Sequence, residues 1–174
     1  MENSPWHAIY AKSNCEKKLC EELLRCGVEC YLPLNKELRK WSDRKKWIEK
    51  PLIPSYVFVR GSRKEMHLAI GLTYAVCFVT FGGRLANIPN NQIETLKLFL
   101  KDCSRNTEMV YEQVKKGEWV RVKYGPMKGI VGEVVEMRGR QRIVLRFASP
   151  ATCILTDISM DEVERIRQNE LAGG

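Results

Sequence analysis

Two aromatic side chains, two residues apart, are the strongest candidates for a functional contact in this sequence. Tyr56 and Phe58 lie in residues 55–59, a β-branched and aromatic run that is typical of a strand. Side chains alternate between the faces of a strand, so the two rings share one face, and Val57 and Val59 share the other. The valine face is suited to packing under helices. The aromatic face is then either buried by the protein or open to a partner, and that choice decides the function.

A basic segment supplies the second candidate contact. The formal net charge is +8, and residues 36–50 carry seven Lys or Arg against three acids. Trp41 and Trp47 flank the centre of this segment, which fits a hairpin that turns near Ser42 and Asp43. The alternative is a solvated loop whose tryptophans pack on the domain. In the hairpin, basic side chains would contact nucleic-acid phosphates, with affinity that falls with salt and little sequence preference. The candidates are Arg39, Lys40, Arg44, Lys45 and Lys46.

The sequence lacks the residue spacings that catalytic and metal-binding sites need. His7 and His67 are the only histidines, and no serine-hydrolase, phosphate-loop or zinc-protease motif occurs. The seven cysteines include no CxxC pair. Cys15 and Cys20 fall on the apolar stripe of an expected helix, where cysteine acts as a small hydrophobe. We therefore expect reduced structural thiols, and no enzyme activity, cofactor or metal.

The composition also indicates a compartment. No apolar run reaches the length of about 18 residues that a membrane span needs, and the N-terminus lacks the pattern of a signal peptide. An odd number of cysteines without an export signal fits a reducing environment. We expect a cytoplasmic protein that has no membrane partner.

The elements around the aromatic strand alternate between strands and helices. The patterns predict strands at residues 6–12, 28–34 and 73–81. They predict helices at residues 15–26, capped by Ser13 or Asn14, at residues 63–72, and after a cap at Asn90 or Asn91. This order is that of a split βαβ sheet with helices on one face and the other face bare. On a bare face, Tyr56 and Phe58 form an exposed apolar patch, which usually marks a binding surface, and Ile88 extends it.

The second half of the chain predicts a linker followed by a small all-β unit. Residues 102–116 are polar and lose clear periodicity. Short strands are predicted at residues 117–124, 130–137, 141–147, 153–158 and 163–166, as in an SH3-like barrel. The turn at residues 125–129 has glycine at each end for backbone freedom. Gly132 interrupts the second strand, where it permits the close approach that a small closed sheet needs.

Motifs in both halves resemble those of one family. PLIPSYVFVR resembles the PLFPGYVFV signature of the amino-terminal (NGN) domain of NusG-family transcription elongation factors, and WHAIYAKSNCEKK resembles the opening strand and helix of that domain. VRVKYGPMKGIVGEV resembles a KOW motif centred on Gly125, Pro126, Gly129 and Gly132. RKWSDRKKWIEKPLIPSYVFV resembles still more closely the UpxY-type paralogs, which are antiterminators of capsular polysaccharide operons. Three positions depart from the family pattern: Ile53 replaces phenylalanine, Ser55 replaces glycine or asparagine, and His7 replaces tyrosine.

The resemblance implies an α+β chain of two domains. An NGN domain of ferredoxin- or RRM-like fold is expected at residues 1–102, a linker at 103–116 and an SH3-like KOW barrel at 117–170. The NGN domain would bind the clamp helices of the largest RNA polymerase subunit through the residues that match Pro54, Tyr56, Phe58 and Ile88. The basic hairpin would lie near DNA at the transcription bubble. The KOW domain would be free to recruit the ribosome or termination factor Rho, and the protein would act as a monomer.

Two other functions remain open at this point. A general elongation factor of the same family would act on every transcribed gene rather than on a few operons. An RNA-binding module would stack bases on Tyr56 and Phe58, as the sheets of RRM domains do. The target operon, its recruiting element, and any masking of one domain by the other are not determined by the sequence.

Overall fold

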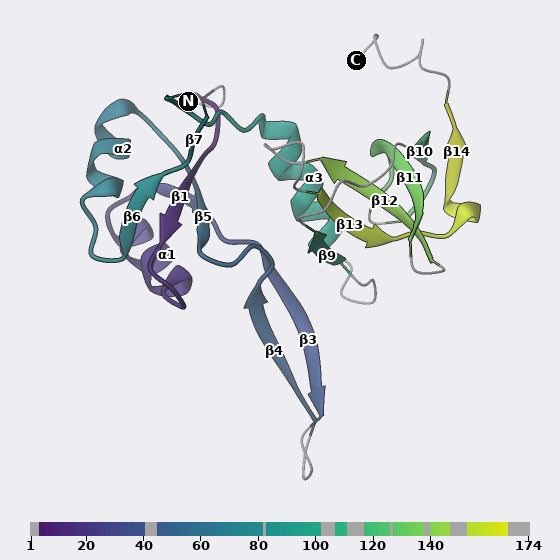
Figure 1. Cartoon of the computed structure of the whole chain (residues 1–174), viewed down its shortest axis with the longest axis horizontal. Coiled ribbons are helices and arrows are strands. Elements are labelled where there is room, and N and C mark those ends of the chain that lie inside the picture. The colour runs from purple at the N-terminus through teal and green to yellow at the C-terminus, as the bar shows by residue number, and fades with distance from the viewer. Residues whose placement is uncertain are drawn as a thin grey trace. The chain divides into compact units, whose positions relative to one another are not determined.

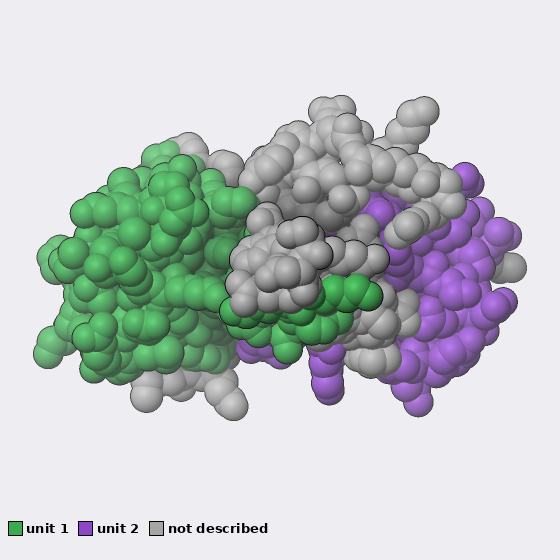
Figure 2. Space-filling view, turned by 90° about the horizontal axis from the view of Figure 1, so that it is seen from below, with its two compact units in different colours: residues 1–93 green, residues 94–174 purple. Residues whose placement is uncertain are grey.

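The structure, a computed structural model, describes residues 4–40, 45–81, 83–101, 107–110, 117–125, 127–137, 140–146 and 153–166. The chain divides into two compact units, residues 1–93 and 94–174 (Figure 2). Each unit contains its own antiparallel sheet of at least four strands. The division falls inside helix α3 (Asn90–Lys101), whereas the sequence predicts a domain end at residue 102.

The first unit is built on a four-stranded sheet in the order β2-β5-β1-β6 (Figure 1). These strands are β1 (His7–Ala11), β2 (Glu29–Tyr31), β5 (Tyr56–Arg60) and β6 (Ala75–Phe78). Helices α1 (Glu16–Arg25) and α2 (Arg63–Ile70) lie on one face. Val57 and Val59 pack there in one buried cluster with Leu19 of α1 and Met66 of α2. The prediction that the valine face packs under helices is confirmed.

The helices begin in different ways. The residue before α1 is Cys15, and its side chain makes no capping hydrogen bond, so the predicted cap at Ser13 or Asn14 is wrong. Helix α2 begins with a capping box, in which the Ser62 hydroxyl accepts from the Glu65 N–H and the Glu65 carboxylate accepts from the Ser62 N–H. Helix α3 begins at Asn90, so the predicted cap at Asn90 or Asn91 lies inside the helix rather than before it.

Two ribbons extend from this unit. The predicted basic hairpin is present as β3 (Leu34–Lys40) and β4 (Lys45–Pro51), and it projects away from the four-stranded sheet (Figure 1). The predicted strand at residues 73–81 is divided into β6 and β7 (Thr80–Phe81), and β7 pairs with β8 (Arg84–Leu85).

The second unit contains a sheet in the order β14-β10-β11-β12-β13-β9. Each of the strands predicted after residue 116 is present. The strands are β10 (Glu118–Val122), β11 (Val131–Met137), β12 (Arg140–Arg146), β13 (Cys153–Asp157) and β14 (Val163–Arg165), with a short 3-10 helix η1 (Met160–Glu162) before the last. That this sheet forms an SH3-like KOW barrel stays a prediction.

Part of the predicted linker belongs to this sheet. Strand β9 (Thr107–Val110) pairs with β13, so a linker over the whole of residues 103–116 is wrong. Thr107 is buried, and its hydroxyl donates to the hydroxyl of Thr156 at 2.8 Å. A polar residue occupies an interior position here, and for that reason the segment shows no apolar alternation in the sequence.

Candidate functional site

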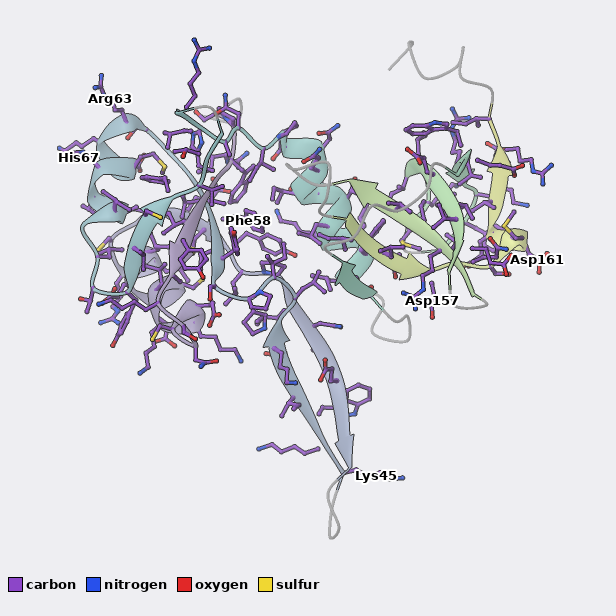
Figure 3. All side chains as sticks on the ribbon, in the orientation of Figure 1. Lys45, Phe58, Arg63, His67, Asp157 and Asp161 are labelled. Carbon is purple, nitrogen blue, oxygen red and sulfur yellow. The ribbon has the colours of Figure 1, made fainter. Side chains whose placement is uncertain are left out.

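On the aromatic face of the first sheet, the side chain of Phe58 is buried. This side chain is 1% exposed, and its ring stacks on Tyr31 with the centroids 6.4 Å apart. Tyr31 lies directly opposite Phe58 in the register of β2 and β5. Phe58 projects from the side of β5 away from α1 and α2 (Figure 3). The prediction that Phe58 is exposed on a bare face is therefore wrong, as is the view of it as a free stacking platform for RNA bases.

Ile88 is also buried, with 1% of its surface exposed. Its backbone exchanges two hydrogen bonds with Trp6, at 3.0 and 2.8 Å. The Trp6 indole donates to Asn90 Oδ1 at 3.0 Å, and the Arg60 guanidinium lies 4.9 Å from the Trp6 ring centroid. Arg60 also donates to both carboxylate oxygens of Glu29 at 2.8 Å. These contacts attach the start of α3 to the sheet, so Ile88 supports the fold rather than extending an exposed patch.

The other end of the same face is open. Tyr10 is 42% exposed, and its ring meets that of half-buried Tyr56 edge to face at 5.4 Å. Pro54, at the entry to β5, is exposed. We call Pro54, Tyr56 and Tyr10 the tyrosine patch. Tyr10 was absent from the predicted site because its position beside Tyr56 depends on the register of β1 and β5, although strand alternation does place it on the face of Trp6 and Ala8.

A buried carboxylate shapes the entry to β5. Ser55 adopts a left-handed backbone with φ of 63°. Its N–H donates to Glu16 Oε1 at 2.7 Å, and its carbonyl accepts from the Ala11 N–H at 2.8 Å. Glu16 is 6% exposed and is the first residue of α1, where the positive end of the helix dipole favours a carboxylate. The left-handed turn explains why glycine or asparagine suits this position in the family that the motif resembles.

The base of the hairpin balances its charges. Lys36 pairs with Glu49 at 3.8 Å, and Lys50 pairs with Glu37 at 3.1 Å. Trp47 is 58% exposed, so the alternative in which it packs on the domain is wrong. Trp41 lies outside the described residues.

The distal end of the hairpin concentrates positive charge. The register places Arg39 opposite Lys46 and Lys40 opposite Lys45. Lys45 and Lys46 are exposed, and Lys45 lies at the far end of the ribbon (Figure 3). Like charges directly opposite each other destabilise a sheet unless something neutralises them, and a polyanion would do so. The side chains of Arg39 and Lys40, and the whole of Arg44, lie outside the described residues.

The glycines of the KOW-like motif lie where the sequence predicts that glycine is needed, either for a turn or for close packing between strands. Gly125 and Gly129 have φ of +84° and +88°, a region that favours glycine. A Cβ at Gly132 would lie 3.0 Å from Cγ1 of Ile143, so the predicted close approach is confirmed. Pro126 lies outside the described residues.

The two histidines lie in different environments. His7 Nδ1 lies 3.0 Å from the Ala86 carbonyl oxygen, and His67 is exposed on the outer side of α2 (Figure 3). Within the described ranges, no three side chains of His, Cys, Asp or Glu gather as metal ligands would. Among those residues, too, none of the helices has the length and apolar character of a bilayer span.

Comparison with known proteins identifies the family. The family model described as "NusG: Transcription termination factor nusG" matches residues 4–97, more than half of the 174-residue chain. A solved structure described as "Domain interaction in Thermotoga maritima NusG" has a TM-score of 0.50 and 18% identity, covering 95% of this chain and 99% of that chain. A chain from "Crystal Structure of MjSpt4:Spt5 complex conformation B" has a TM-score of 0.34 and 16% identity, covering 94% of this chain and 97% of that chain. The chain belongs to the NusG family of transcription factors.

Proposed function

We propose that this protein is a transcription antitermination and elongation factor that binds the clamp helices of the largest RNA polymerase subunit through the tyrosine patch. The observation that carries the proposal is the pair of exposed Tyr10 and half-buried Tyr56 on the sheet face opposite α1 and α2 in a NusG-family domain. Paired aromatic rings at a partly open surface give large contact area at low cost in conformational entropy. Phe58 and Ile88 support this surface from within the fold.

The mechanism is a shift between clamp states. A protein bound across the clamp favours the closed state only by as much as it binds that state more tightly. A closed clamp suppresses pausing and termination. The resemblance of the hairpin segment to UpxY-type antiterminators supports action on specific operons of the capsular polysaccharide type.

The distal hairpin is proposed to contact DNA near the transcription bubble. Its two opposed basic pairs, Arg39–Lys46 and Lys40–Lys45, have no acid opposite them in the register, unlike Lys36 at the base. Phosphate contacts of this kind position a protein without reading sequence. The KOW-like unit is proposed to recruit the ribosome, because an antiterminator of this kind is expected to have lost contact with the termination factor Rho.

The test is recovery of core RNA polymerase by tagged variants of the full chain. We expect Tyr56→Ala to weaken binding about tenfold or more, because tyrosine is a common interface hot spot. Leu24→Ala is the matched control, since Leu24 is 61% exposed on α1, on the opposite side of the sheet. Equal recovery of polymerase by both variants would contradict the site assignment.

Phe58→Ala is unsuitable for this test. Removing a ring that is 1% exposed should cost about 3–5 kcal/mol of stability, so lost binding would also follow from unfolding.

Action on specific operons has a separate test, which is to map where the protein is bound across the genome. We expect the protein to be bound at a few operons. Binding at every transcribed gene would favour a general elongation factor instead.

A further inference from the structure

Two half-buried thiols, those of Cys20 and Cys30, face each other between α1 and β2. The sulfur atoms of Cys20 on α1 and Cys30 on β2 are 3.1 Å apart. A disulfide bond is about 2.05 Å long, so a movement of about 1 Å brings the sulfurs to bonding distance. Both residues are free thiols here.

The two thiols are chemically unequal. The hydrogen bond from the Cys30 thiol favours the Cys20 thiolate and lowers the pKa of Cys20. The same hydrogen bond, together with burial, raises the pKa of Cys30. The Cys30 thiol can also donate to the Cys20 carbonyl oxygen, at 3.6 Å. Because the thiolate is the nucleophile in thiol–disulfide exchange, Cys20 is the attacking residue and Cys30 the resolving residue.

We propose that Cys20 and Cys30 are a redox-active dithiol, which a low-molecular-weight disulfide such as oxidised glutathione converts to an intramolecular disulfide. The Cys20 thiolate attacks one sulfur of oxidised glutathione, and a glutathione thiolate leaves. The Cys30 thiol then loses its proton to solvent, its sulfur attacks Cys20 Sγ, and the second glutathione leaves. Two protein thiols are oxidised, and one glutathione disulfide is reduced to two thiols.

The bond would fasten an edge strand to a helix. Strand β2 has three residues and pairs only with β5 in its sheet. Tyr31, which stacks on Phe58, directly follows Cys30. A covalent link from Cys30 to α1 therefore limits fraying of the strand that places Tyr31 over Phe58.

The test uses the full chain equilibrated in buffers of varied reduced-to-oxidised glutathione ratio, quenched with acid, alkylated and mapped by peptide mass spectrometry. We expect a Cys20–Cys30 crosslink in wild type and in the control Cys26→Ser, which alters an exposed cysteine one residue beyond α1. Cys30→Ser should leave Cys20 joined to glutathione, and Cys20→Ser should leave Cys30 as a thiol. Full alkylation of both residues at every ratio, or a bond from Cys20 to Cys15 or Cys26, would overturn the proposal.

A second measurement needs no substitution. Oxidised wild type should melt about 5 °C higher than reduced wild type and should show slower amide exchange in β2, with both effects reversed by reductant. Unchanged exchange in β2 after complete crosslinking would contradict the role assigned to the bond.

Discussion

At the scale of single residues, Ser55 departs from the family pattern at a position whose left-handed backbone favours glycine or asparagine. Ser55 is one of two non-glycine residues with positive φ in the described part of the chain, and Asn14 is the other. Left-handed backbone costs a residue with a Cβ about 1–2 kcal/mol. The hydrogen bond from the Ser55 N–H to Glu16 holds this conformation and directs the chain into Tyr56.

We expect Ser55→Gly to raise the free energy of unfolding by about 0.5–1 kcal/mol, because relief of the strained φ exceeds the added entropy of the unfolded chain. Urea denaturation would show this as a higher midpoint with an unchanged slope. Ser13→Gly is the control, since exposed Ser13 lies in a turn without positive φ. A Ser55→Gly protein that is less stable than wild type would contradict the explanation.

The capping box of α2 should make stability depend on pH. The hydrogen bonds from Ser62, its side chain first, lower the pKa of Glu65 from its ordinary 4.5. The folded state therefore binds fewer protons than the unfolded chain, and the resulting stability is present above pH 4.5 and is lost as the pH falls through the lowered pKa. Ser62→Ala removes the main cause. We expect the difference in urea midpoint between wild type and Ser62→Ala to shrink on acidification, whereas a constant difference would contradict this.

At the scale of elements, close packing between strands decides where glycine is required. A Cβ at Gly132 of β11 would lie 3.0 Å from Cγ1 and 3.2 Å from Cδ1 of Ile143 on β12. Gly129 differs, because a Cβ built there would have no neighbouring atom within 4 Å. A substitution at Gly129 therefore strains only the backbone.

We expect Gly132→Ala to destabilise the protein by about 1–3 kcal/mol through overpacking. Part of this loss should be recovered in an Ile143→Val background, because the substitution removes Cδ1. A double-mutant cycle from thermal unfolding measures the recovery. Gly129→Ala should show no coupling with Ile143→Val, and coupling of equal size at both glycines would rule out the packing explanation.

At the scale of the whole molecule, charge is distributed unevenly along one hairpin. The chain carries a net charge of +8, yet the lysines at the hairpin base are paired with Glu49 and Glu37. The exposed Lys45 and Lys46 lie opposite other basic residues. Affinity for DNA should therefore depend on the distal end of the ribbon rather than on the total charge.

We expect Lys45→Gln/Lys46→Gln to weaken binding to duplex DNA and to reduce the slope of log affinity against log salt by about 2. Lys36→Gln/Lys50→Gln is the matched control, because it removes the same charge from the same hairpin at positions already neutralised. Fluorescence anisotropy at several salt concentrations gives both slopes. Equal slopes for the two double variants would contradict a distal contact.

The sequence by itself determined the elements and the alternation of faces, since both depend on neighbours a few residues apart. It predicted Val57 and Val59 under the helices, the basic hairpin and the glycine turn at Gly125 and Gly129. Strand β9 escaped prediction because a threonine, Thr107, occupies a buried position where the pattern for a strand calls for an apolar residue.

Only the tertiary structure decided which aromatic residue is open to a partner. Tyr31 lies over Phe58, and Tyr10 lies beside Tyr56, through strand pairs that are distant in sequence. Alternation along one strand assigns Tyr56 and Phe58 to the same face. Exposure on that face depends on the register of neighbouring strands, and this register is a non-local property that residue spacing does not encode.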